Sequence, residues 1–184
     1  MGYTTEFEGE FQLDRPLTPE HRAFLAKFSE TRRMKRRAEV TALRPDPLRN
    51  AAGLPVGFEG AFFVGADAEM GQEHTPDIVD WNRPPHNQPG LWCKWAPNER
   101  GTAVAWNGHE KFVEYVPWLD YLIRNFLKPW GYVLKGTVEF QGEELDDFGR
   151  IHVRENVVRL AQGEGPQNAR MRDLFEPTEE EDEE

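Results

Sequence analysis

A group of side chains of the types that bind metal ions lies in the middle of the chain. Its members are Glu73, His74, Asp77, Asp80, His86, Cys93 and His109. Zinc in proteins is held by His and Cys nitrogen and sulfur together with carboxylate oxygens. The strongest ligand candidates are His74, Asp77, Asp80 and His86. Their separations match no closed zinc motif such as paired C-x-x-C, so they favour the alternative, loop residues that cap turns and bond to the backbone.

Aromatic and basic side chains near this group could line a groove for a base, a sugar or a peptide. The candidates are Trp81, Arg83 and Trp92, followed by Trp95 and Trp106. Stacking on a ligand needs an exposed aromatic face beside a positive charge. Since aromatic side chains are often buried, core packing is the alternative for most of them. The alternation of a strand predicts that Trp92 and Trp95 lie on opposite faces.

A basic run, residues 32–37, follows the first predicted helix, and we expect that helix to continue into it. Arg33, Arg36 and Arg37 are candidates for contacting a phosphate or an acidic partner. Two alternatives stay open. The run could be a solvated helix end, or it could bind the acidic tail of its own chain.

Covalent catalysis has few candidates in this sequence. Ser29 is the one serine of the chain and Cys93 the one cysteine. None of the motifs G-x-S-x-G, H-E-x-x-H, G-x-G-x-x-G or the phosphate-binding loop occurs. Cys93 with a histidine is a formal possibility for thiol catalysis, but a lone cysteine inside a strand is more often inert. The acidic loop 143–147 lacks the spacing of a calcium-binding loop.

The elements that must position these residues are clearest between residues 110 and 160. Apolar side chains recur at helical spacing from Phe112 to Phe126, with Pro117 either kinking the helix or lying in its first turn. A strand over residues 132–141 contains Gly136, which suggests a bulge or a close backbone approach. Glu155-Asn156 predicts a tight turn between two further strands.

The first half of the chain predicts a strand over residues 3–11, a helix that begins at Thr18-Pro19, and a hairpin over residues 91–106. Between them, proline and glycine interrupt residues 38–90, where we expect one helical turn (48–52), a buried strand (61–64) and otherwise packed irregular structure. The order of elements predicts an α+β two-layer sandwich. It has a mainly antiparallel sheet, two principal helices and a long irregular insertion.

Composition limits the class of protein. The 184 residues predict a single α+β domain over 1–162 and an acidic tail over 163–184 that is too polar to fold alone. Seven acidic residues between Glu176 and Glu184 supply much of the net charge of −11. Without a long apolar run or a signal pattern, and with one cysteine, we expect a cytoplasmic protein.

The pattern from Trp130-Gly131-Tyr132 through Leu134 and Gly136 to Gln141-Gly142-Glu143 resembles one that recurs in small uncharacterised bacterial and phage-encoded proteins. The similarity includes the helix at Trp118 to Ile123 and the opening at Leu17-Thr18-Pro19. It covers most of the chain apart from the acidic tail. The resemblance implies a cytosolic protein of bacterial or phage origin and carries no activity or ligand.

The sequence therefore favours a non-enzymatic binding or accessory protein that acts through contacts with another protein, without a cofactor. One alternative is an enzyme with its site in residues 58–95, assisted by a divalent metal. Another is an inhibitor whose acidic surface imitates nucleic acid. Nucleic acid itself is a less favoured partner, and the oligomeric state is left open.

Overall fold

The fold is described from a computed structural model, which covers residues 2–65 and 75–165. Its main element is a seven-stranded antiparallel sheet in the order β5-β6-β2-β7-β8-β9, with β1 also paired to β7. The strands are β1 (Thr5–Glu8), β2 (Phe11–Leu13), β5 (Trp95–Pro97), β6 (Ala103–Trp106), β7 (Leu134–Gly142), β8 (Phe148–Arg154) and β9 (Val157–Gln162). The expected α+β class with an antiparallel sheet is confirmed.

β1 and β2 are two parts of one path along the sheet. Phe7 lies opposite Phe140 and Phe11 opposite Gly136, so both parts keep the same register against β7. The interruption falls at Gly9, whose φ is 104°. At Gly136, with φ 137°, an added Cβ would lie 3.1 Å from the carbonyl oxygen of Glu10. The close backbone approach expected at Gly136 is therefore present, and only glycine fits it without strain.

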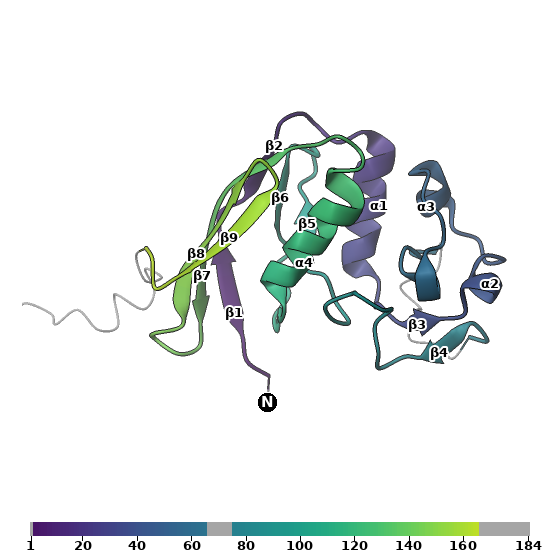
Figure 1. The fold of residues 1–184 in the computed structure, drawn as a ribbon. Coiled ribbons are helices and arrows are strands. Elements are labelled where there is room, and N and C mark those ends of the chain that lie inside the picture. The colour runs from purple at the N-terminus through teal and green to yellow at the C-terminus, as the bar shows by residue number, and fades with distance from the viewer. Residues whose placement is uncertain (1, 66–74, 166–184) are drawn as a thin grey trace, which may run out of the picture.

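Two helices cover one face of the sheet and lie side by side (Figure 1). α1 (Pro19–Glu30) is capped by Thr18, whose hydroxyl accepts a hydrogen bond from the backbone of His21 at 3.2 Å. α4 (Tyr115–Leu122) continues as a π-helical turn, η3 (Ile123–Leu127). Pro117 lies in the first turn of α4, where its missing N–H has no helical partner to lose.

The predicted helix ends are partly right. The chain leaves η3 through Gly131 at φ 83°, as the sequence indicated. The expectation that α1 runs on through residues 32–37 is wrong, because α1 ends at Glu30 and Thr31 is extended (φ −101°, ψ 124°). The hydroxyl of Thr31 donates to the carbonyl of Lys27 at 2.7 Å and satisfies one of the last helical acceptors.

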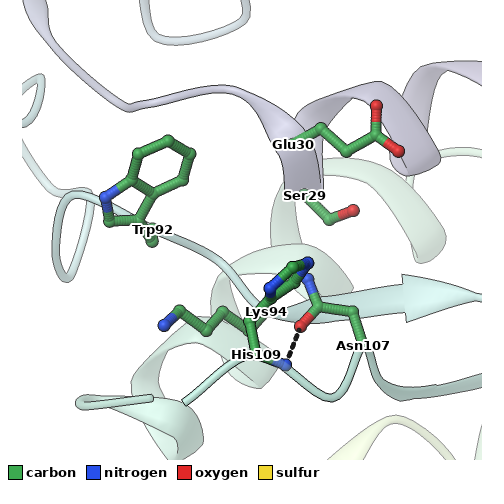
Figure 2. Close-up of a pocket in the computed structure, with 6 residues that line it drawn as sticks. All are labelled: Ser29, Glu30, Trp92, Lys94, Asn107 and His109. Atoms are coloured by element: carbon green, nitrogen blue, oxygen red, sulfur yellow. Dashed lines mark hydrogen bonds between the residues drawn. The ribbon is translucent and has the colours of Figure 1, made fainter. Parts of the chain in front are cut away.

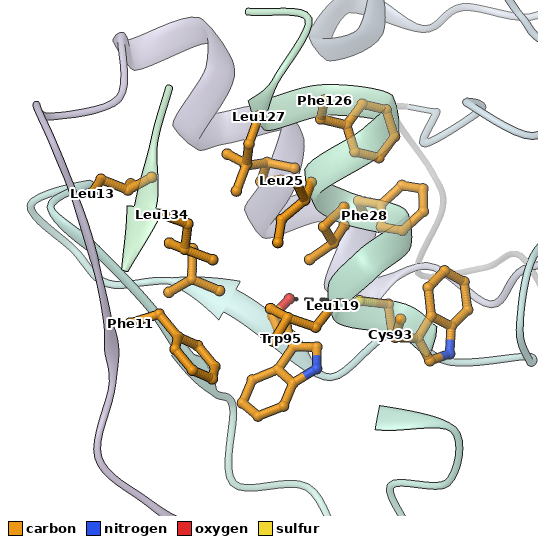
Figure 3. Packing of buried hydrophobic residues seen from close by; sticks show 14 of the residues in the cluster. Phe11, Leu13, Leu25, Phe28, Cys93, Trp95, Leu119, Phe126, Leu127 and Leu134 are labelled. Atoms are coloured by element: carbon orange, nitrogen blue, oxygen red, sulfur yellow. Dashed lines mark hydrogen bonds between the residues drawn. The ribbon is translucent and has the colours of Figure 1, made fainter. Parts of the chain in front are cut away.

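The hydrophobic core lies between the helices and the sheet (Figure 3). Phe24, Leu25 and Phe28 from α1 meet Trp118, Leu119 and Leu122 from α4, and both sets pack on strand residues such as Phe11, Trp95 and Leu134. Phe28 lies 5.3 Å from Phe126 and 5.9 Å from Trp118, in edge-to-face contacts. Core packing thus accounts for Trp95 and Trp118, which are 1% and 0% exposed.

The described residues of segment 31–90, which are 31–65 and 75–90, form a further body of chain beyond α1, on the side away from the sheet (Figure 1). It contains β3 (Lys35–Arg36), α2 (Ala38–Thr41), α3 (Pro47–Ala51), η1 (Phe58–Gly60) and β4 (Ile78–Asp80). β3 and β4 pair as a separate two-stranded sheet. The helical turn expected at 48–52 is present as α3. The strand expected at 61–64 is not formed, although Phe63 and Val64 are buried.

No helix among the described residues is long and apolar enough to cross a membrane. Glu73, His74 and most of the acidic tail lie outside the described ranges.

Candidate functional site

A surface recess of about 330 Å³ lies between the end of α1 and the strand that leads into β5 (Figure 2). It is lined by Ser29, Glu30, Trp92, Lys94, Asn107 and His109. Trp92 and Lys94 come from one extended stretch, two residues apart, so their side chains point the same way. Glu30 faces them from the last residue of α1.

Backbone hydrogen bonds on both sides hold the stretch that carries Trp92 and Lys94. The N–H of Arg33 donates to the carbonyl of Leu91 at 2.8 Å, and the N–H of Asn107 donates to the carbonyl of Lys94 at 2.9 Å. The first bond ties the stretch to the residues after α1, and the second ties it to the end of β6. The backbone that carries the recess is therefore held by hydrogen bonds on both sides.

The far wall is a tight turn after β6. The side chain of Asn107 accepts a hydrogen bond from the backbone of His109 at 3.1 Å (Figure 2). The indole N–H of Trp106 donates to the carbonyl of His109 at 3.0 Å, which holds the turn against the strand. Asx-type bonds of this kind fix short loops.

The two charged side chains of the recess differ in sign and in exposure to solvent. The ammonium of Lys94 hydrogen-bonds the carbonyl of Glu110, and burial together with the charge of Lys111 lowers the pKa of Lys94. The side chain of Glu30 is exposed. An aromatic face, a partly desolvated cation and a carboxylate thus surround one hollow, an arrangement that can hold an anionic or aromatic group by charge and stacking.

Nucleophilic chemistry finds little support next to this recess. Cys93, between Trp92 and Lys94, is 0% exposed, and burial raises the pKa of its thiol to about 12. The hydroxyl of Ser29 donates to the carbonyl of Ala26 within its own helix at 2.7 Å. A thiol needs a lowered pKa and access to solvent to act as a nucleophile.

Asp77, Asp80 and His86, the described members of the predicted metal site, form no metal-binding group. Asp77 is 0% exposed and accepts hydrogen bonds from Arg36 at 2.8 Å and Thr41 at 3.1 Å. Asp80 accepts from the backbone of Asn82 at 2.9 Å, and the backbone of His86 donates to Glu59 at 2.8 Å. Within residues 2–65 and 75–165, no group of three or more His, Cys, Asp and Glu side chains is placed to hold a metal.

Asp77 is instead the anion of a buried arginine network. Burial alone would raise the pKa of Asp77, but hydrogen bonds from Thr75 and Arg36 and the charges of Arg36 and Arg44 hold it well below its usual range. Arg44 lies 3.2 Å from the carboxylate. His74 is outside the described residues, so its place relative to Asp77 is not described.

The predicted binding residues are divided between the core and the surface. Arg33 and Arg36 are 2% and 3% exposed, so the expected surface contact with a phosphate or an acidic partner is corrected for these two. Arg33 donates to the carbonyls of Ala61 (2.6 Å) and Phe63 (2.9 Å). Burial lowers the pKa of Arg33 to about 10.

The remaining predicted binding residues are at the surface. The guanidinium of Arg32 stacks on Trp81 at 4.2 Å, and Arg83 lies 3.5 Å from Asp80. Arg37 donates to the carbonyl of Pro76 at 2.9 Å. Trp92 alone of the predicted set lines the recess.

Sequence reasoning missed Glu30, Lys94 and Asn107 as neighbours of Trp92. Lys94 could have been found, because strand alternation places it on the same face as Trp92. Glu30 and Asn107 could not, since they join the recess only through the packing of α1 and β6. Comparison of the chain with protein-family models, curated proteins and solved structures found no match.

Proposed function

We propose that this protein is a non-enzymatic binding protein and that it holds a partner protein at the Trp92–Lys94 recess. The observation that carries the proposal is the recess itself, where an aromatic ring, a cation and a carboxylate surround about 330 Å³. Tryptophan is among the residues that contribute most to protein–protein binding when they lie at the centre of a patch, and Trp92 has that place here.

The size of the recess favours a side chain of a partner over a free small molecule. Small-molecule sites usually measure about 300–1,000 Å³ and enclose most of the ligand. This recess is at the lower end of that range, enough for one large side chain. The partially desolvated Lys94 favours an aromatic or acidic side chain as the inserted group, because a cation near an indole attracts both.

The setting of the proposal comes from the sequence: a bacterial or phage system, in the cytoplasm, without a cofactor. No contact among the described residues favours the two alternatives, a metal-assisted enzyme and an acidic mimic of nucleic acid. We therefore expect the partner to be a protein.

The test compares capture of partners from a bacterial lysate by the full chain and by two double variants. Trp92→Ala/Lys94→Glu changes the recess, and Trp81→Ala/Arg83→Glu changes a tryptophan and an exposed cation elsewhere. We expect a partner that binds the wild type and the second variant and is lost from the first. Circular dichroism and thermal unfolding check that both variants fold.

A partner that stays bound to Trp92→Ala/Lys94→Glu would remove the recess from the interface. A partner lost only from Trp81→Ala/Arg83→Glu would move the interface to the second tryptophan. Turnover of a substrate that depends on residues of the recess would contradict the non-enzymatic proposal.

A further inference from the structure

The strand β9 lies at one end of the sheet and pairs with β8 on one side. A two-residue turn, Glu155-Asn156, joins the two strands, and the register along β9 has no shift. In the same register, the N–H of Gly163 donates to the carbonyl of Phe148 at 2.7 Å. Since alternate residues of a paired strand point their backbone groups the same way, the odd-numbered residues of β9 face β8.

The even-numbered residues of β9 therefore point their backbone groups away from the sheet. They are Val158, Leu160 and Gln162. No hydrogen bond within residues 2–65 and 75–165 uses the backbone N–H or carbonyl of these three residues. Their donors and acceptors thus form an open row at the rim of the sheet, to which a further strand can add.

The sequence of β9 lacks the features that usually prevent an edge strand from pairing. The strand contains no proline, no lysine and no bulge. At the other end of the sheet, β5 is three residues long. The N–H of Asn98 donates to Ala103 of β6, so Trp95 and Pro97 face outward, and proline has no N–H to donate. Of these two ends, β9 is the one that can accept a further strand.

The edge at β9 also exposes apolar surface. Leu160 lies opposite Ile151, which is 0% exposed, so both side chains point to the face that the helices cover. Leu160 is nevertheless 44% exposed. The neighbouring Arg159 points to the other face of the sheet. A strand that pairs with β9 would cover Leu160 if it placed an apolar side chain beside it.

The sequence of β9 is complementary to itself about Leu160. When two copies run antiparallel with their Leu160 residues opposite each other, Val158 lies opposite Gln162 of the second copy, and Arg159 lies opposite Ala161. Each outward N–H then meets an outward carbonyl. A centre moved by one residue would instead set the two Arg159 side chains directly opposite each other, which is unfavourable. The register centred on Leu160 therefore fits a second copy of this chain.

We propose that the protein forms a two-fold dimer in which β9 of each copy pairs antiparallel with β9 of the other, centred on Leu160. The two sheets join into one continuous sheet, and the two Leu160 side chains cover each other. Because both open edges are used, the assembly closes as a dimer. Each copy contributes one strand to the contact, so the interface is small and the dimer depends on concentration. The proposal does not depend on the recess at Trp92.

Amide hydrogen exchange of the full chain, followed by NMR at low and high protein concentration, tests the contact residue by residue. In the monomer, the N–H groups of Val158, Leu160 and Gln162 are unpaired and exchange fast. We expect their exchange to slow as the concentration rises. Arg159 and Ala161 donate to β8 in both states and stay protected throughout. Sedimentation analysis of the same samples measures the monomer–dimer equilibrium.

Two variants at Leu160 block the contact in different ways. Leu160→Pro removes an outward N–H and leaves the bonds to β8 in place, a change that edge strands tolerate. Leu160→Lys keeps the N–H but sets two cations opposite each other. Each variant should raise the dissociation constant of the dimer at least about tenfold.

Two further variants are the controls. Leu160→Val keeps both the N–H and an apolar side chain, and Val79→Lys adds the same charge to an exposed valine of β4. Both should dimerise as the wild type does. Circular dichroism and thermal unfolding check that every variant folds. If Leu160→Pro does not fold, Leu160→Lys decides the test.

A chain that stays monomeric at all concentrations would overturn the proposal. So would a dimer that persists in the folded Leu160 variants, since the interface would then lie elsewhere. Protection of Val158, Leu160 and Gln162 that does not change with concentration would also overturn it, because the edge would then be covered within one copy.

Discussion

Buried arginines hold segment 31–90 in place at the level of single residues. Arg33 uses carbonyl oxygens and the amide oxygen of Gln88 (3.2 Å) as acceptors, and its guanidinium lies 4.1 Å from the ring centre of Phe28. Arg36 pairs with Asp77, although one of its terminal nitrogens, Nη2, is buried without a hydrogen-bond partner among the described residues. Such groups are costly to bury, so each remaining partner matters for stability.

Replacing the carboxylate of Asp77 should therefore destabilise the fold strongly. Asp77→Asn keeps the volume but leaves the Arg36 guanidinium buried without its counter-charge. We expect a loss of about 3–5 kcal/mol in the free energy of unfolding. Urea denaturation at pH 7 measures it. The control Asp80→Asn, in an exposed pair with Arg83, should cost less than about 1 kcal/mol.

The same carboxylate predicts how stability depends on pH. The pKa of Asp77 is lower in the folded state than its ordinary value of 3.8. The stabilisation is complete above that value and is lost as the pH falls below it. The difference in the free energy of unfolding between wild type and Asp77→Asn should thus become smaller as the pH is lowered from 4. A constant difference would show that Asp77 is not the titrating group.

The thiol of Cys93 should be inert in the folded protein. It is fully buried and its pKa is raised to about 12, so both thiolate formation and access are suppressed. We expect a thiol reagent at pH 8 to modify native Cys93 at least about a thousandfold more slowly than the urea-unfolded chain. Arg124→Cys, at an exposed position, provides the fast-reacting control. Rapid modification of native Cys93 would restore it as a catalytic candidate.

At the scale of elements, the sequence pattern correctly predicted the helix ends and turns that are determined by residues close together in the chain. Thr18-Pro19 starts α1, Gly131 ends the second helix, and Glu155-Asn156 forms the β8–β9 turn with φ values of 48° and 66°. The end of α1 was missed because residues 32–37 leave the helix to bond with distant chain. Lys35, for example, donates its N–H to the carbonyl of Arg83 at 2.8 Å. No spacing within the run encodes that partner.

The β8–β9 turn also joins the hairpin to the start of β7. The side chain of Asn156 accepts from the N–H of Leu134 at 2.7 Å and donates to the carbonyl of Tyr132 at 2.9 Å. Asn156→Gly keeps the positive φ but removes both bonds, and we expect a loss of about 2 kcal/mol. Thermal and urea unfolding give the value.

Glu155→Gly is the matched control in the same turn. Glycine relieves the left-handed conformation but also frees the unfolded chain, so the net change should stay within about 0.5 kcal/mol. Equal losses for the two variants would mean that the turn geometry, and not the Asn156 side chain, stabilises the hairpin.

At the scale of the whole molecule, the sheet and the two helices share one hydrophobic core, whereas segment 31–90 depends more on buried polar contacts. The sequence could indicate that the middle region is packed, from its aromatic content. It could not indicate which charges are inside, because the partners are far apart along the chain. Arg36 meets Asp77, and Arg33 meets Ala61 and Phe63. The recess at Trp92 could not be predicted from the sequence for the same reason.

This division predicts that the two parts open separately. Asp46 accepts hydrogen bonds from the backbone of Val64 at 3.2 Å and Gly65 at 3.0 Å, and from the side chain of Arg49 at 3.0 Å. Asp46→Ala removes these three bonds, together with the cap that Asp46 gives the backbone N–H of Arg49 in α3, without touching the sheet. Hydrogen exchange should accelerate at Val64 and Gly65 and stay unchanged in β7 and β8, because regions with few apolar contacts open locally. Uniform acceleration through β7 and β8 would instead mean that segment 31–90 and the sheet unfold as one cooperative unit, in which the arginine network stabilises the entire protein.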